Sequence, residues 1–96
     1  MLLDQIRRLK PSLQQLAAQH GAKRLRVFGS VARGEETPDS DVDFLVQLAP
    51  GYDLFSQRIS LTQALSGLLQ RNVDLVPEHE LNPFIRDKVL TEAIDL

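Results

Sequence analysis

The chain has 96 residues, of which 43% are hydrophobic and 25% are charged, a composition that favours one small globular domain over residues 1–96. It contains no cysteine, which excludes disulfides and thiol chemistry, and no apolar run approaches the roughly 20 residues that a membrane span requires. The net charge of −2 and the acidic middle of the chain do not favour direct nucleic-acid binding, and the start lacks a signal-peptide pattern, so we expect a cytoplasmic protein.

Helical and extended patterns alternate through the first half of the chain. Apolar residues at spacings of three and four predict an amphipathic first helix, which Pro11 should bend or restart and Gly21 should end. A strand is expected over about residues 24–28, followed by a short helix that can begin at Ser30, a favourable N-cap residue. A loop then leads to a second strand over 42–48.

The second half continues the same alternation. A proline–glycine pair at 50–51 ends the second strand, and a long helix is expected over about 53–70, with Asp53 as a candidate cap. A third strand is expected over 72–76, and Asn82 should cap a final helix whose first residue is proline. We therefore predict an α/β (α+β) fold in which helices flank a small mixed β-sheet.

Side chains outside the motifs are assigned by class. Hydrophobic residues of the last two helices are expected in the core, the last three of them being also candidates for contact with a partner: Leu54, Phe55, Leu65, Phe84, Val89 and Ile94. Charged residues in the first strand and the following loop are expected to be exposed: Lys23, Arg24, Arg26, Glu35 and Glu36.

A glycine–serine pair, Gly29 and Ser30, follows the first apolar strand. Glycine lets the backbone approach a ligand closely, and the amides of the following helix together with the Ser30 hydroxyl could bind phosphate oxygens. Taken alone, such a pair is more often a simple strand-ending turn. Arg33 lies one helical turn beyond Ser30 and could face the same ligand, although an ordinary surface arginine is an equal alternative.

Two carboxylates, Asp41 and Asp43, open the second strand ten residues after the glycine–serine pair. Side chains two positions apart on a strand share a face, and two anions held together repel each other unless a cation or a proton lies between them. A hard divalent ion such as Mg²⁺ prefers carboxylate oxygens. Alone, the two acids could be a solvated strand start, but the neighbouring motifs favour metal binding.

Asp74 lies at the centre of the third apolar strand. An ionised group buried there would cost several kcal/mol without a partner. A strand beside 42–48 would bring Asp74 next to Asp41 and Asp43, and three such carboxylates can hold one or two Mg²⁺ ions. The alternative is an ion pair between Asp74 and a core-facing arginine.

The whole pattern of glycine–serine, ten residues, Asp-x-Asp and a later aspartate in a strand resembles the nucleotidyltransferase superfamily related to polymerase beta. The runs 28–35 and 40–46 resemble its smallest branch, the minimal nucleotidyltransferases, and 81–86 resembles the start of that branch's last helix. These domains have about the length of this chain, and no signature position departs from their pattern.

The resemblance implies an enzyme that uses ATP as substrate and two Mg²⁺ ions held by Asp41, Asp43 and Asp74. Asp74 would also activate the attacking hydroxyl, while the phosphate-binding residues would be Gly29, Ser30 and Arg33. The resemblance further implies an antitoxin that transfers AMP to a tyrosine of a cognate HEPN-domain ribonuclease toxin.

Three other interpretations remain open from the sequence. The chain could be an antitoxin that neutralises its partner by binding alone, with an idle nucleotide site. It could modify a small molecule, as aminoglycoside nucleotidyltransferases do, although that class usually carries an additional helical domain. It could also be a plain structural domain with acids at its surface.

Overall fold

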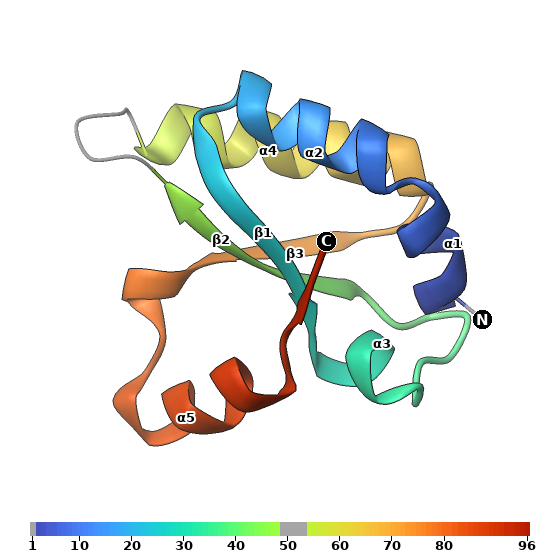
Figure 1. Ribbon diagram of the computed structural model, residues 1–96, viewed down its shortest axis with the longest axis vertical. Coiled ribbons are helices and arrows are strands. Elements are labelled where there is room, and N and C mark those ends of the chain that lie inside the picture. Colours follow the sequence, from blue (N-terminus) through green and yellow to red (C-terminus); the bar gives the residue numbers. More distant parts are fainter. Residues whose placement is uncertain (1, 49–53) are drawn as a thin grey trace.

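Helices cover both faces of a mixed β-sheet (Figure 1). A computed structural model describes residues 2–48 and 54–96, and within them the sheet has four strands in the order β3-β2-β1-β4. The elements are α1 Leu2–Arg8, α2 Lys10–Gln19, β1 Ala22–Phe28, α3 Gly29–Arg33, β2 Val42–Leu48, α4 Leu54–Leu69, β3 Val73–Pro77, the 3-10 helix η1 Glu78–Glu80, α5 Pro83–Glu92 and β4 Ile94–Asp95. β2 and β3 are parallel, whereas β1 is antiparallel to both β2 and β4.

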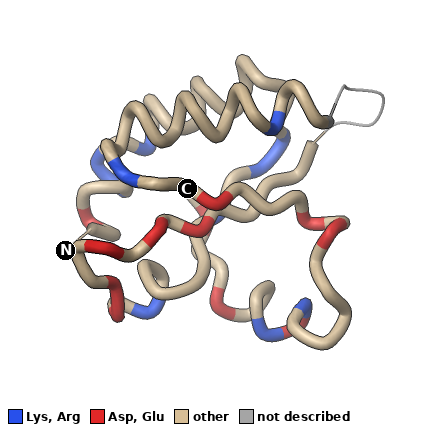
Figure 2. Tube along the Cα trace, turned by 180° about the vertical axis from the view of Figure 1, so that it is seen from behind, with Lys and Arg blue, Asp and Glu red and all other residues tan. Residues whose placement is uncertain are grey.

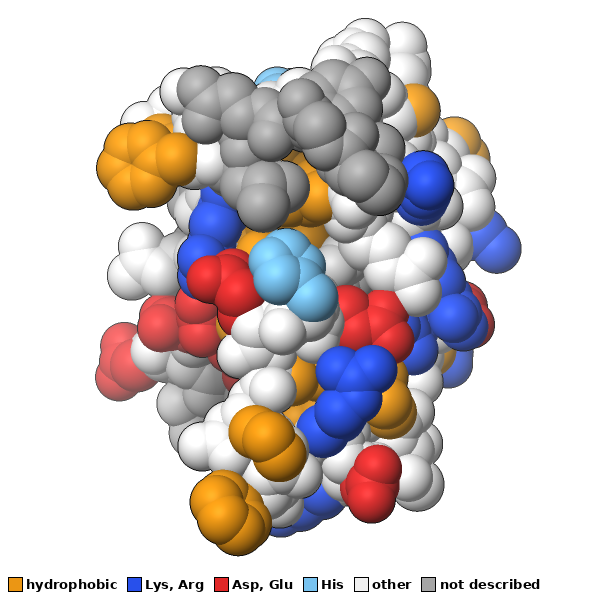
Figure 3. Space-filling model, turned by 90° about the vertical axis from the view of Figure 1, so that its left-hand side faces the viewer, with side chains coloured by type: hydrophobic (Ala, Val, Ile, Leu, Met, Phe, Trp, Pro, Cys, Tyr) orange, Lys and Arg blue, Asp and Glu red, His pale blue; other side chains and the backbone are white. Residues whose placement is uncertain are grey.

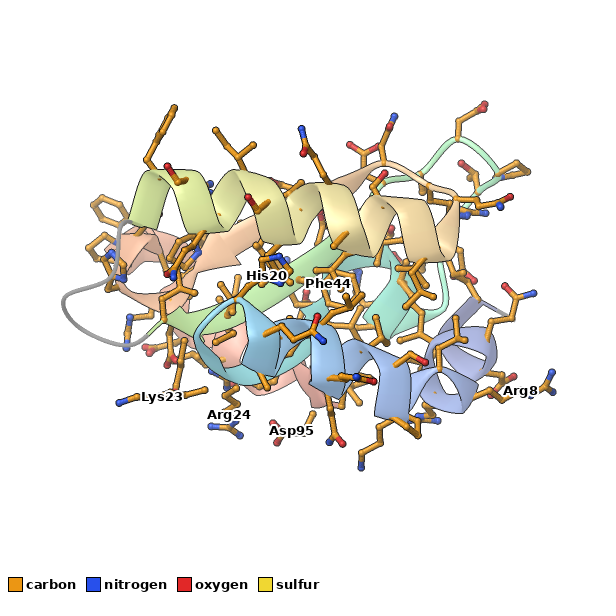
Figure 4. All side chains as sticks on the ribbon, turned by 90° about the horizontal axis from the view of Figure 1, so that it is seen from above. Arg8, His20, Lys23, Arg24, Phe44 and Asp95 are labelled. Atoms are coloured by element: carbon orange, nitrogen blue, oxygen red, sulfur yellow. The ribbon has the colours of Figure 1, made fainter. Side chains whose placement is uncertain are left out.

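One face of the sheet forms the main core. Alternate strand residues such as Val27, Phe44 and Leu75 are buried there with apolar residues of α1, α2 and α4. Figure 1 shows α2 and α4 side by side over this face, and Figure 4 shows Phe44 beneath them. None of the helices in the described ranges is both long and apolar enough to cross a bilayer.

The opposite face carries a smaller core and the acidic residues. Leu45 of β2 packs there with Leu81 and Val89, under η1 and α5 (Figure 1). Because side chains alternate along a strand, Asp43 projects from the same face as Leu45. The acids therefore lie on the side of the sheet that α3 and α5 border.

The sequence signals at Pro11, Gly21 and Asn82 are confirmed. The first helical segment is interrupted at Leu9, and Pro11 lies in the first turn of α2. Gly21 follows α2 with a φ of 76°, and the Asn82 side chain accepts a 2.9 Å hydrogen bond from the Phe84 amide at the start of α5. The helix α3 begins at Gly29, so Ser30 is not its N-cap.

Two aromatic residues do not lie where the sequence analysis placed them. The core assignment is wrong for Phe55 and Phe84, which are 76% and 96% exposed, whereas Leu65 and Val89 are buried as expected. Ile94 is half-buried but belongs to β4 rather than to the last helix. The expected cap at 53 and the 50–51 break, like the side chain of residue 54, lie outside the described residues.

Arg26 is buried rather than exposed, because β1 places it on the acid-bearing face of the sheet under η1. Its Nη2 lies 3.0 Å from Glu78 Oε2, and Gln47 Nε2 donates to the same carboxylate oxygen at 2.6 Å. The hydrogen bond from Gln47 and the guanidinium of Arg26 hold the pKa of Glu78 below its ordinary value. Arg24, in contrast, lies at the sheet edge beside Asp95, with Nε 2.7 Å from Oδ1 (Figure 4).

Candidate active site

The chain turns sharply at Gly29, between β1 and α3. Its φ of 74° lies in the left-handed region that side chains disfavour. A Cβ added at Gly29 would also collide with the Asp43 carboxylate. Only glycine fits this position, and the two sequence motifs are in direct contact there.

Asp43 and Asp74 occupy adjacent positions on the parallel strands β2 and β3. Neighbouring strands lie about 4.8 Å apart, so both carboxylates extend from the same end of one sheet face. Asp41 stands two residues before Asp43, just ahead of the first residue of β2, and its carboxylate is close enough to affect the pKa of Asp43. The expectation that the third strand brings Asp74 beside Asp43 is confirmed. Asp74 is exposed rather than buried, and the buried arginine pairs with Glu78 instead.

The electrostatics of Asp43 reflect this crowding. Burial, together with the carboxylates of Asp74 and Asp41, raises the pKa of its carboxyl from the ordinary 3.8 to about 6, while Arg33 opposes them. Figure 2 shows the acidic segments following one another through the loop before β2 and into the sheet. The ionised form of Asp43 therefore lacks sufficient compensating positive charge.

The donor set fits a hard divalent cation. It consists of carboxylate oxygens, and the two outer acids, Asp41 and Asp74, are exposed to solvent. Within residues 2–48 and 54–96, no three acidic or histidine side chains lie close enough together to form a preassembled metal cluster. Because repulsion among the acids adds to burial in raising the pKa of Asp43, a cation bound beside these carboxylates would be favoured by all three charges.

The donors next to Gly29 already hold an anion, the side chain of Glu92. The Gly29 amide donates to Glu92 Oε2 at 2.7 Å, and Arg33 Nη1 lies 3.1 Å from both carboxylate oxygens of Glu92. Arg33 Nε donates to Glu35 Oε2 at 3.1 Å, and these bonds to Glu35 and Glu92 raise the pKa of Arg33. Ser30 follows Gly29 in α3 and is half-buried.

Sequence reasoning missed Glu92 as a member of this site. Glu92 lies 63 residues from Gly29, at the end of α5. No motif in the neighbouring sequence indicates that it belongs to a binding site. The placement of Arg33 beside the Gly29 turn is confirmed. Its predicted contact with phosphate stays a prediction.

The loop that carries Asp41 is fastened to the start of β3. Arg71 Nη1 donates to the carbonyl oxygens of Thr37 and Ser40, at 3.2 and 3.0 Å. A polar hollow of about 410 Å³ opens beside Asp41, and neither Gly29 nor Asp43 lines it. Its lining is Pro38, Asp39, Ser40, Asp41, Ser66, Gln70, Arg71 and Asn72.

Known proteins are similar to this chain in sequence and in fold. Residues 6–96 match the nucleotidyltransferase domain family. The protein adenylyltransferase MntA of Thermococcus cleftensis is 38% identical over 81 residues, which make up 84% of this chain and 81% of that protein. A solved structure provisionally named a minimal nucleotidyltransferase has a TM-score of 0.87 at 48% identity, covering 100% of this chain and 97% of its own. A crystal structure described as a toxin–antitoxin with AMP-PNP has a TM-score of 0.71 at 26% identity, covering 84% of this chain and 66% of its own.

Proposed function

Because the chain belongs to the nucleotidyltransferase domain family, we propose that it transfers AMP from ATP to a hydroxyl group of a partner protein. The observation that carries this proposal is the position of Asp43, which touches the Gly29 turn on one side and neighbours Asp74 on the other. A phosphate-binding turn and a cation-binding acid set thus meet on one face of the sheet. That combination is what nucleotidyl transfer requires.

Asp41, Asp43 and Asp74 would hold the metal. Two Mg²⁺ ions bound there would neutralise the triphosphate and lower the pKa of the attacking hydroxyl. Asp74 is exposed at the edge strand of the sheet, where an incoming acceptor can approach it. We assign Asp74 to receive the hydroxyl proton as the bond to the α-phosphate forms.

The β- and γ-phosphates would be held by the Gly29 amide, the Ser30 hydroxyl and the Arg33 guanidinium. Gly29 leaves room for close approach of the phosphates because it has no side chain. The planar fork of Arg33 suits phosphate oxygens and would stabilise the negative charge of the departing pyrophosphate. These residues bind and orient the nucleotide, whereas the acids act at the reacting phosphorus.

The acceptor class is supported by the relatives. One relative is named a protein adenylyltransferase, and a structural neighbour is described as a toxin–antitoxin with an ATP analogue. With the resemblance found in the sequence, these favour an antitoxin whose acceptor is a tyrosine hydroxyl of a cognate HEPN-domain toxin in the cytoplasm. Transfer would add bulk and negative charge at the modified tyrosine.

The test is incubation of the chain with its cognate toxin and MgATP, followed by peptide mass spectrometry. We expect one or more toxin tyrosines to gain the mass of AMP, and the Asp43→Asn variant, shown to be folded by circular dichroism, to leave them unmodified. A toxin that is neutralised equally by both proteins and carries no AMP would instead favour an antitoxin that acts by binding alone. Labelling of aminoglycosides but not of protein would favour a small-molecule acceptor.

A further inference from the structure

We infer that Glu92 is an internal occupant of the phosphate-binding position, which ATP must displace before transfer can occur. The inference rests on the proposed function of Gly29 and Arg33. It concerns a residue that comes from the far end of the chain and is outside the acid set of Asp41, Asp43 and Asp74.

The contacts of Glu92 are those expected of a bound phosphate. One carboxylate oxygen accepts a 2.7 Å hydrogen bond from the Gly29 amide, and both oxygens lie 3.1 Å from Arg33 Nη1. A carboxylate, like a phosphate, presents several anionic oxygens to N–H donors. The Gly29 amide has a single hydrogen, so it cannot donate to Glu92 and to ATP at the same time.

The depth of Glu92 separates it from an ordinary surface ion pair. Its side chain is 16% exposed, whereas that of Glu35, the other partner of Arg33, is 65% exposed. The Glu35 carboxylate accepts from the guanidinium Nε, whereas the Gly29 amide donates to Glu92. Both acids neutralise Arg33, but only Glu92 takes the backbone donor of the turn.

Displacement does not require the fold to open. Glu92 is the last residue of α5, and its flexible side chain can rotate while α5 remains packed through Val89. The carboxylate also lies within electrostatic reach of Asp43, so its departure removes one repulsive charge from beside that acid. The nucleotide thus replaces one anion with another at the same donors.

A self-occupied site lowers the apparent affinity for nucleotide by the fraction of molecules in which the site is open. If that fraction is about one in ten, removing Glu92 should tighten nucleotide binding about tenfold. Removing Glu92 should tighten the binding of the triphosphate but not that of the nucleoside, which has no phosphate to occupy the position.

The experiment is calorimetric titration with the magnesium complex of α,β-methylene-ATP, which cannot undergo transfer, and with adenosine as a second probe. The variants are Glu92→Gln and Glu92→Ala, with Glu35→Gln as the matched control, because it removes the same charge from Arg33 but no bond from Gly29. We expect binding about tenfold tighter for both Glu92 variants and a change of less than about twofold for Glu35→Gln. In ¹H–¹⁵N spectra, the Gly29 amide proton should move upfield in Glu92→Ala, because it loses a charged acceptor.

Three results would overturn the inference. Unchanged or weaker binding by folded Glu92 variants would show that the carboxylate does not compete with the nucleotide. Equal tightening by Glu35→Gln would show a general charge effect instead. If neither the wild type nor any variant binds the triphosphate, the proposed function fails together with the inference, whereas wild-type binding without a gain from Glu92 removal overturns the inference alone.

Discussion

Gly29 and Asp43 constrain each other more tightly than any other pair of residues in the site. The left-handed backbone of Gly29 and the carboxylate packed against its Cα leave no space for a side chain. The same contact keeps Asp43 partly buried, which contributes to the raised pKa of its carboxyl. At this scale, the turn and the metal-binding acid act as one unit.

Gly29→Ala should destabilise the protein by about 2 kcal/mol or more, because a left-handed non-glycine residue costs about 1–3 kcal/mol before any collision is counted. It should also displace Asp43 and weaken Mg²⁺ binding. Urea unfolding measures the first effect and magnesium titration the second. Gly67→Ala is the control: it adds a Cβ in open space within α4 and should stabilise by up to about 1 kcal/mol. Equal effects of the two substitutions would contradict this account of the turn.

Asp43→Asn should stabilise the metal-free protein at neutral and alkaline pH. The carboxyl has a pKa of about 6 in the folded chain against an ordinary 3.8, so the folded state is penalised as pH rises through this window, and below it the penalty vanishes. Since the group is partly exposed, we expect a gain on the order of 1 kcal/mol at pH 8, falling to nothing below pH 4. Thermal unfolding in EDTA across this pH range measures it.

Added Mg²⁺ should make the wild type more stable than Asp43→Asn, because a ligand stabilises only a protein that binds it. The wild type should then gain stability while Asp43→Asn gains little. A variant that is less stable than the wild type in EDTA at pH 8 would contradict the electrostatic account of the site.

The elements η1 and α5 are joined to the sheet by one buried cluster around Glu78. Its carboxylate accepts from Gln47 and pairs with Arg26, and its backbone oxygen accepts from Arg86 Nη1 at 3.2 Å. Arg26 is almost fully enclosed, so its charge depends on this partner. The cluster links η1 and α5 to β1 and β2.

Glu78→Ala should therefore cost about 3 kcal/mol of unfolding free energy, because it leaves Arg26 buried without its carboxylate. Glu80→Ala, which removes an exposed pair with Arg58 from the same short helix, should cost less than about 1 kcal/mol. Since its partners lower the pKa of Glu78, its contribution is present at neutral pH and is lost as pH falls below the ordinary value of 4.5. Urea unfolding of both variants at pH 7 and pH 4 tests this, and similar costs at pH 7 would contradict it.

Local sequence signals predicted most elements because each is decided by neighbours in the chain. Pro11, Gly21 and Asn82 act through their own backbone or side chain within a few residues. The pairing of Asp43 with Asp74 could also be predicted. A carboxylate in an apolar strand needs a partner, and a cation shared with the acids of a neighbouring strand would supply one. Two-residue β4 could not, since it exists only through its pairing with β1.

At the scale of the molecule, the features that escaped prediction depend on contacts between distant segments. Arg26 has the sequence environment of an exposed residue, and only the packing of η1 over β1 buries it. Phe84 lies in the first turn of α5, yet its side chain is almost fully exposed. Figure 3, which faces the η1 and α5 end, shows hydrophobic side chains projecting at its lower edge beside charged groups of both signs. The sequence pattern predicts that α5 is a helix, but it does not predict which side of the helix faces solvent.

The central claim is that Asp41, Asp43 and Asp74 form, with the Gly29 turn, a site for nucleotidyl transfer. The most direct measurement compares ATP labelled at the α-phosphate with ATP labelled at the γ-phosphate, each incubated with Mg²⁺ and the cognate toxin. The account predicts that only the α-label reaches the toxin, that EDTA or Asp43→Asn abolishes the transfer, and that Asp95→Asn, at the opposite edge of the sheet, leaves it intact. Transfer of the γ-label, or undiminished transfer of the α-label by a folded Asp43→Asn protein, would contradict it.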